Sequence, residues 1–186
     1  MVLLQLIDAV SWAALSTWFG GALFLAVASG VIFRVHRDAD PTLPRVLSVN
    51  IESDHASLLS AEVVSGIDRV YSLIGLVCAA VIVLLLVVRS IVEPDGNGVR
   101  LVVGVVVLFG SILTAYQGRS LRPRIERARL DYIAHADDPE QSADARSRFN
   151  RFSREYLNVL MLQIAVLLAA ILFSAVRMPG PIILAE

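Results

Sequence analysis

Four long runs without a charged residue constrain this chain more than any other feature of its sequence. The runs cover residues 9–33, 70–88, 101–118 and 156–176. A helix needs about 20 apolar residues to cross a membrane, with a working range of about 17–25. All four runs lie within that range, and a soluble core would hardly contain four of them. The sequence therefore predicts an all-α integral membrane four-helix bundle, formed by residues 1–186 as a single membrane domain.

The composition supports this prediction. Of the 186 residues, 56% are hydrophobic and only 18% are charged, whereas soluble domains are about half apolar and about a quarter charged. The excess of apolar surface requires a lipid bilayer as solvent. A formal net charge of −1 provides no global field that would attract nucleic acid, so we expect no nucleic-acid partner.

The arginines predict how the helices are oriented. Thirteen of the 16 basic residues lie in the first and third connections between the runs, and only Arg89, Arg100 and Arg177 lie on the other side. Connections rich in basic residues stay in the cytoplasm. We therefore expect both termini outside the cytoplasm, with the protein in a plasma membrane. The five arginines of residues 119–129 could also attract anionic lipid headgroups, at about 1 kcal/mol per residue near the surface.

The third connection has the pattern of a cytoplasmic helical hairpin over about 119–155. Asp138 and Pro139 have the residue types of a helix start, an N-cap followed by a proline at the first helical position. Two sets of apolar residues recur at helical spacing and could face each other: Leu121, Ile125, Ala128 and Tyr132, and Ala145, Phe149, Phe152 and Tyr156. Pro123 is expected to kink the outgoing arm. The shorter connection at 93–98 predicts a tight turn, and Ser53-Asp54 could cap an early start of the second helix.

Polar and small residues inside the runs are candidates for packing between helices. Gln117, Asn158 and Gln163 are expected to hydrogen-bond across helices, because lipid offers no partner. We expect Asn158 to bond near Gln117 or Tyr71. Gly20 and Gly21 lie among small residues of the first run that let backbones approach closely, either within the bundle or at a homodimer seam.

Charged residues beside the second run are candidates for ion pairs at the inner membrane boundary. Glu62 and Asp68 are expected to pair with Arg119 or Arg122, and a cluster that gates ions is the alternative. We find no catalytic motif, and we predict no cofactor and no metal site. His36, His55 and His135 all lie in connections, and Cys78 is the only cysteine.

Several short motifs together resemble the transmembrane-protein-205-like four-span family, whose bacterial members form a domain of unknown function. The motifs are Trp18-Phe19-Gly20-Gly21, Phe33-Arg34, Ala61-Glu62, Asp68-Arg69, Arg122-Pro123-Arg124-Ile125, and Phe149-x-x-Phe152 with Asn158. The chain departs from the family pattern at Gly30, where a proline is expected, and at Ser153, where a histidine is expected. The resemblance implies four spans and a bacterial inner-membrane location without an assigned reaction. Eukaryotic relatives linked to drug resistance and secretion suggest transport or trafficking.

These observations together predict a non-enzymatic protein, either an assembly or scaffold subunit or a transport-associated component. It could form a homo-oligomer or bind another membrane protein. The alternative is a small oligomeric channel or exporter in which Gln117, Asn158 and Gln163 line a path.

Overall fold

The structure is a computed structural model that describes residues 2–39, 55–93 and 97–175. The predicted cap at Ser53-Asp54 and residues 94–96 of the predicted tight turn lie outside the described residues. Everything stated below concerns the described part of the chain.

The described residues are almost entirely helical. The helices are α1 (Val2–Ala39), α2 (His55–Val92), α3 (Asn97–Tyr116), the π-helical turn η3 (Gln117–Leu121), α4 (Arg122–Ala134) and α5 (Pro139–Ala175). Since η3 and α4 continue α3 without a gap, residues 2–39, 55–93 and 97–175 form four long helices. All four are long and apolar enough to cross a membrane. The prediction of an all-α bundle of four long apolar helices is confirmed.

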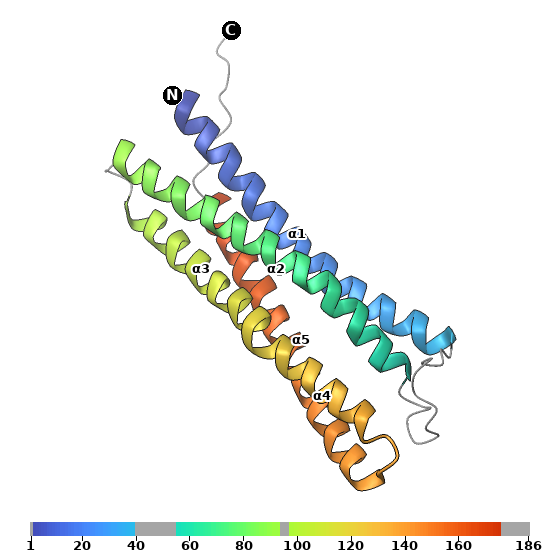
Figure 1. The fold of residues 1–186 in the computed structure, drawn as a ribbon. Helices are drawn as coiled ribbons and strands as arrows, with labels where there is room; N and C mark the ends of the chain where they lie inside the picture. Colours follow the sequence, from blue (N-terminus) through green and yellow to red (C-terminus); the bar gives the residue numbers. More distant parts are fainter. Residues whose placement is uncertain (1, 40–54, 94–96, 176–186) are drawn as a thin grey trace.

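The helices run up and down beside one another (Figure 1). α1 lies along α2, α3 lies between α2 and α5, and α5 also contacts α1, which closes the bundle. The start of α1, the end of α2 and the end of α5 lie at one end of the molecule. The end of α1, the start of α2 and the turn between α4 and α5 lie at the opposite end, which we call the arginine-rich end. The connectivity therefore brings the two arginine-rich connections to the same end.

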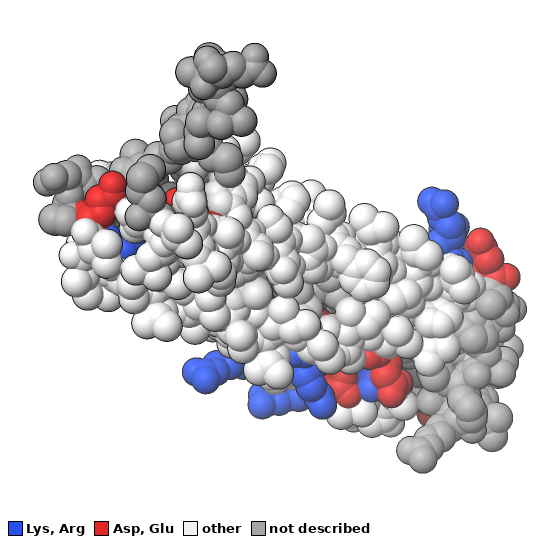
Figure 2. Space-filling model, turned by 90° about the horizontal axis from the view of Figure 1, so that it is seen from above, with Lys and Arg blue, Asp and Glu red and all other residues white. Residues whose placement is uncertain are grey.

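The helices are longer than the uncharged runs. α1 and α2 each contain 38 residues, which corresponds to about 57 Å at 1.5 Å per residue. The hydrocarbon layer of a bilayer is about 30 Å thick, so each helix extends well past it. Figure 2 shows a face with a broad uncharged area, and charged residues lie at its two ends and along its lower edge. Part of the bundle at the arginine-rich end therefore extends beyond the hydrocarbon layer.

α4 packs against the first part of α5 after a short turn. The side chain of Asp138 accepts hydrogen bonds from the backbone N–H groups of Glu140 and Gln141, at 3.1 and 3.2 Å, which is the N-cap that the sequence predicts. A separate apolar cluster joins the two helices and contains Leu58, Ala128, Tyr132, Ala136, Ala145 and Phe149. Leu58 belongs to α2, so these helices do not form a free-standing hairpin: the start of α2 completes their core.

The kink expected at Pro123 takes the form of one π-helical turn. The backbone N–H of Arg122 bonds to the carbonyl oxygen of Gln117, five residues earlier, and Pro123 lies in the first turn of α4. Proline cannot donate a backbone hydrogen bond, so the wider turn before it accommodates the missing bond. α3 and α4 remain one continuous rod, with an extra residue inserted where they join.

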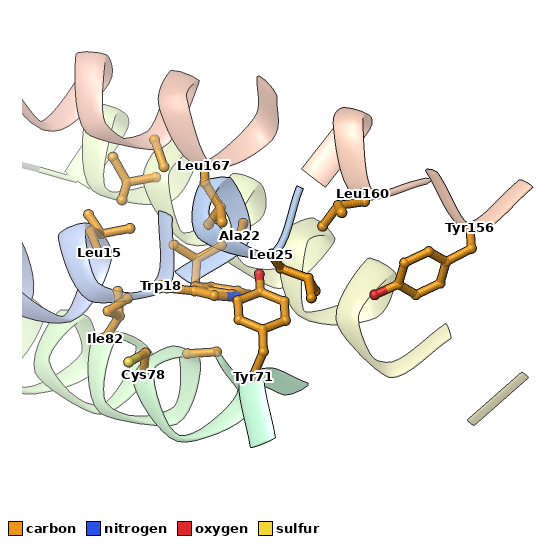
Figure 3. Close-up of a cluster of buried hydrophobic side chains, with 14 of the residues drawn as sticks. Leu15, Trp18, Ala22, Leu25, Tyr71, Cys78, Ile82, Tyr156, Leu160 and Leu167 are labelled. Atoms are coloured by element: carbon orange, nitrogen blue, oxygen red, sulfur yellow. The ribbon is translucent and has the colours of Figure 1, made fainter. Parts of the chain in front are cut away.

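The main core is centred on Trp18, which is completely buried (Figure 3). Two glycines leave the space that its indole ring fills. A Cβ at Gly75 would lie 2.6 Å from Trp18 Nε1, and a Cβ at Gly110 would lie 3.3 Å from Trp18 Cη2. A Cβ at Gly21 would lie 3.0 Å from Tyr71 Cδ2, whereas one at Gly20 would meet nothing within 4 Å. Of the two candidate glycines, only Gly21 packs inside the bundle.

Candidate functional site

A cavity of about 460 Å³ lies between α1, α2, α4 and α5 in the arginine-rich half of the bundle. Most of its wall is apolar, with Ala26, Phe33, Val64, Ile125 and Leu157 among the lining residues, and serine hydroxyls interrupt that wall. We call this cavity the inner pocket. Its size is within the range of small-molecule sites, about 300–1,000 Å³.

A buried carboxylate closes one end of the inner pocket. Asp68 is only 1% exposed. Arg122 donates to Asp68 Oδ2 from Nε at 2.8 Å, with Nη2 2.6 Å from the same oxygen. The Tyr156 hydroxyl donates to Oδ1 at 2.7 Å. Because a buried charge is costly unless it is paired and hydrogen-bonded, these contacts are what allow a carboxylate to lie inside the bundle.

The residues of α2 that contact Arg122 and the residue of α2 that packs against Trp18 lie on the same face of the helix. Asp68, Ser72 and Gly75 follow one another at i, i+4 and i+7, which places them on the same side of a helix. Arg122 Nη2 also donates to the Ser72 hydroxyl at 3.0 Å. Asp68, Arg122 and Tyr156 thus join α2, α4 and α5 through one carboxylate, and we call them the buried triad.

A second group of charges lies beside the inner pocket. Arg129 contacts Glu62 of α2 at 2.8 Å and Glu126 of its own helix at 2.9 Å. Glu126 also lines the inner pocket. The arginine is mostly buried, with 10% of its side chain exposed, whereas that of Glu62 is 61% exposed. This group therefore lies nearer the surface than the buried triad.

Deeper in the bundle, hydrogen bonds between neutral side chains link three helices. Gln163 Nε2 of α5 donates to the Tyr71 hydroxyl at 2.8 Å and to Thr114 Oγ1 at 2.7 Å. Gln117 is also fully buried, but neither its amide nitrogen nor its amide oxygen has a hydrogen-bond partner among the described residues. The amide oxygen of Gln163 also lacks a partner among the described residues. The bundle therefore satisfies the amide nitrogen of Gln163 but neither amide atom of Gln117.

The structure places the predicted intramembrane residues in different environments. Gln117 and Gln163 face the bundle, as expected. The expectation for Asn158 is wrong: its side chain is exposed on α5, and no hydrogen bond joins it to Gln117 or Tyr71 within the described residues. The physical reason is helix geometry. Asn158 is two residues past the buried Tyr156, and two residues turn an α-helix by about 200°.

The four charged candidates are also separated by the fold. Asp68 and Arg122 come together in the buried triad. Glu62 contacts Arg129 rather than either expected arginine, and Arg119 is exposed. The sequence interpretation missed Tyr156 and Ser72 as partners of Asp68. The sequence did contain a signal for Tyr156: it is a tyrosine at the start of the fourth uncharged run, at the same membrane boundary as Asp68, and its hydroxyl can donate a hydrogen bond to a carboxylate.

The described residues contain no group of three or more histidine, cysteine or acidic side chains that could hold a metal ion. His36 Nδ1 lies 3.0 Å from the Ser60 hydroxyl, and Cys78 is buried in the core. The inner pocket itself presents apolar walls, serine hydroxyl groups and one hydrogen-bonded ion pair. Comparison with family models, curated proteins and solved structures found no match for this chain.

Proposed function

We propose that this chain is a non-enzymatic, transport-associated membrane protein that binds an amphipathic small molecule in the inner pocket. The observation that carries the proposal is the combination of apolar walls with a hydrogen-bonded ion pair at one end. Such a site accommodates a hydrocarbon body and orients it by a polar group, which is the usual division of roles in ligand pockets.

The rim of the inner pocket supports entry from the bilayer. Phe33 of α1 and Leu157 of α5 line the pocket and are also 44% and 47% exposed. In a membrane bundle, exposed leucine and phenylalanine contact lipid tails. A hydrophobic molecule could therefore move between α1 and α5 without crossing water.

The proposal includes an orientation and a location. We place the arginine-rich end in the cytoplasm, at the anionic headgroups of that leaflet, because basic connections are retained there. The turn between α4 and α5 then projects into the cytoplasm, and both termini lie outside. The resemblance to the transmembrane-protein-205-like family supports a bacterial inner membrane and an association with transport.

The channel alternative has weaker support. It required Gln117, Asn158 and Gln163 to line one path, but Gln117 and Gln163 are fully buried between helices and Asn158 faces outward. A scaffold that binds another membrane protein also remains a proposal. It predicts that a partner protein purifies with the chain, whereas the pocket proposal predicts a bound small molecule.

Photolabelling tests the pocket. A long-chain alcohol that carries a diazirine would be activated in the presence of the purified protein, and labelled residues mapped by mass spectrometry. Two matched variants decide the outcome: Gly30→Phe in the pocket and Gly20→Phe outside it. A Cβ meets nothing within 4 Å at either glycine, so neither substitution crowds its immediate surroundings.

We expect the wild type and Gly20→Phe to be labelled at lining residues such as Ser153 and Val64. Gly30→Phe should lose most of that labelling and keep the background on lipid-facing helices. Equal labelling of the lining residues in both variants would contradict the pocket.

Cysteine labelling on intact cells tests the orientation. Single cysteines at Asp137 and Gly98, both exposed positions, would be introduced with Cys78→Ser. An impermeant thiol reagent should modify the variant at Gly98 and spare the one at Asp137 until the cells are opened. The reverse result would invert the proposed topology and leave the pocket test unaffected.

A further inference from the structure

A second, larger groove of about 1,000 Å³ runs along the outer surface of α5. It begins near Tyr132 and Pro139 and ends at Asn158. Three arginines line it, Arg146, Arg151 and Arg154, together with several small polar side chains. It differs from the inner pocket in being polar and in lying on the surface, so the two call for different ligands.

The charges of this groove are unbalanced. Its only carboxylate is that of Glu155, whose Oε1 accepts a hydrogen bond from the Tyr116 hydroxyl at 2.6 Å. The sequence suggests an ion pair between Arg151 and Glu155, but the structure holds Glu155 on Tyr116 of α3 instead. Within the described residues, neither Arg151 nor Arg154 has a carboxylate partner. Two guanidinium groups three residues apart therefore share one face of α5.

The groove ends where the membrane begins. Arg154 is the last basic residue before the uncharged run at 156–176, and Asn158 follows one helical turn later. On the same side, Met161 and Leu162 are 60% and 46% exposed. Along this face, α5 presents arginine, then an amide, then apolar side chains, which is the order of charge, ester and hydrocarbon in a phospholipid.

Asn158 is an independent indication of a ligand. Its amide is exposed in a segment whose surroundings are lipid, and no side chain of the described structure bonds to it. An amide facing lipid without a partner is costly. Ester or phosphate oxygens at this depth would accept its N–H groups.

We propose that Arg151, Arg154 and Asn158 form a binding site for the headgroup of an anionic phospholipid, with its acyl chains lying over Met161 and Leu162. The inference rests on the orientation in the proposed function, which places this end of α5 in the cytoplasmic leaflet, and not on the inner pocket. It locates the lipid on α5 rather than on the arginine run of η3 and α4. In that run, Arg122 and Arg129 are already bound to carboxylates.

The test compares two pairs of arginines with the same charge. The purified full-length protein would be titrated with phosphatidylglycerol and, separately, with phosphatidylcholine, and bound lipid counted by native mass spectrometry. Arg151→Gln/Arg154→Gln removes the proposed site. Arg124→Gln/Arg127→Gln removes the same charge from exposed positions of α4, and Asn158→Leu removes only the amide.

We expect the wild type to retain phosphatidylglycerol in preference to phosphatidylcholine. The Arg151/Arg154 variant should bind it roughly 30-fold more weakly. The Arg124/Arg127 variant should weaken binding less than about threefold, and Asn158→Leu should give an intermediate loss. Unchanged thermal unfolding of the variants would show that the fold is retained.

Three outcomes would overturn the site. An equal loss for the two arginine pairs would mean diffuse attraction to the basic surface. Equal retention of the two lipids by the wild type would mean that no anionic headgroup is recognised. A wild-type dimer that dissociates in the Arg151/Arg154 variant would identify a second copy as the occupant. Since none of these residues lines the inner pocket, failure here leaves the photolabelling result unaffected.

Discussion

The two halves of the bundle are held together by different interactions. Around Trp18 the helices approach through glycine contacts at Gly21, Gly75 and Gly110, and side chains fill the interior. Around Asp68 the helices are linked by the charged and hydrogen-bonded contacts of the buried triad. The inner pocket lies in this second half and not in the first.

The difference follows from the reach of the side chains. At Gly21, Gly75 and Gly110 the missing side chain leaves room for an aromatic ring from another helix, and that ring fills the interior. An arginine that reaches across to a carboxylate can bridge helices that stay further apart. Close packing is therefore found in the half without a pocket, and long polar bridges are found in the half that contains the inner pocket.

The largest expected effect comes from breaking the buried triad. Asp68→Ala leaves the Arg122 guanidinium buried without its partner, and removing one member of a buried ion pair costs about 3–5 kcal/mol. Thermal unfolding in detergent should show this loss. The double variant Asp68→Leu/Arg122→Met should recover most of it, because it leaves no uncompensated charge. A double variant as unstable as Asp68→Ala would mean that the pair is not what stabilises this half.

A smaller effect is expected in the packed half. Gly75→Ala places a Cβ against the indole ring of Trp18, and overpacking of this kind typically costs about 1–3 kcal/mol. Gly66→Ala on the same helix meets nothing within 4 Å, so it is the matched control and should unfold like the wild type. The same unfolding measurement checks both. Indistinguishable stabilities would contradict the glycine contact.

The smallest effect separates the two buried glutamines. Gln163→Leu removes two hydrogen bonds between helices, and such bonds average about 0.6 kcal/mol each in membrane proteins. Gln117→Leu removes an amide that has no partner among the described residues, so it should leave stability unchanged or raise it. In a chemical unfolding titration, a lower free energy of unfolding for Gln163→Leu and a higher one for Gln117→Leu would support this difference between the two glutamines. A clear loss of stability for Gln117→Leu would show that its amide is bonded in the membrane.

The sequence was sufficient for the four long helices and for part of the apolar contact between α4 and α5, but Leu121 and Tyr156 of the two predicted sets lie in the main core instead. Both correct predictions follow from local patterns, namely uncharged runs and apolar residues at helical spacing. It was also sufficient to mark Asp68 as one member of an ion pair. Its partner could not be chosen between Arg119 and Arg122, because that choice depends on the π-helical turn that contains Arg119 and ends just before Arg122. No residue pattern predicted that turn.

Asn158 shows a second limit of prediction from the sequence. A polar residue in an apolar run was expected to face the bundle. That inference assumes that a side chain facing away from the bundle would be surrounded only by lipid tails. Here α5 buries Tyr156 and Gln163, seven residues apart on one face, and Asn158 lies on the other side. Its surroundings depend on how deeply α5 sits in the bilayer, and no pattern within the chain records that depth.

The π-helical turn η3 has a consequence for how this chain tolerates insertions and deletions. It holds one residue more than an α-helical turn, so the segment after it is out of phase with α3 by about 100°. A single-codon deletion within residues 117–121 would restore a regular helix and rotate Arg122 away from Asp68, although every side chain of the buried triad would still be encoded. The geometry of the ion pair thus depends on the length of this segment as much as on the residues that form it.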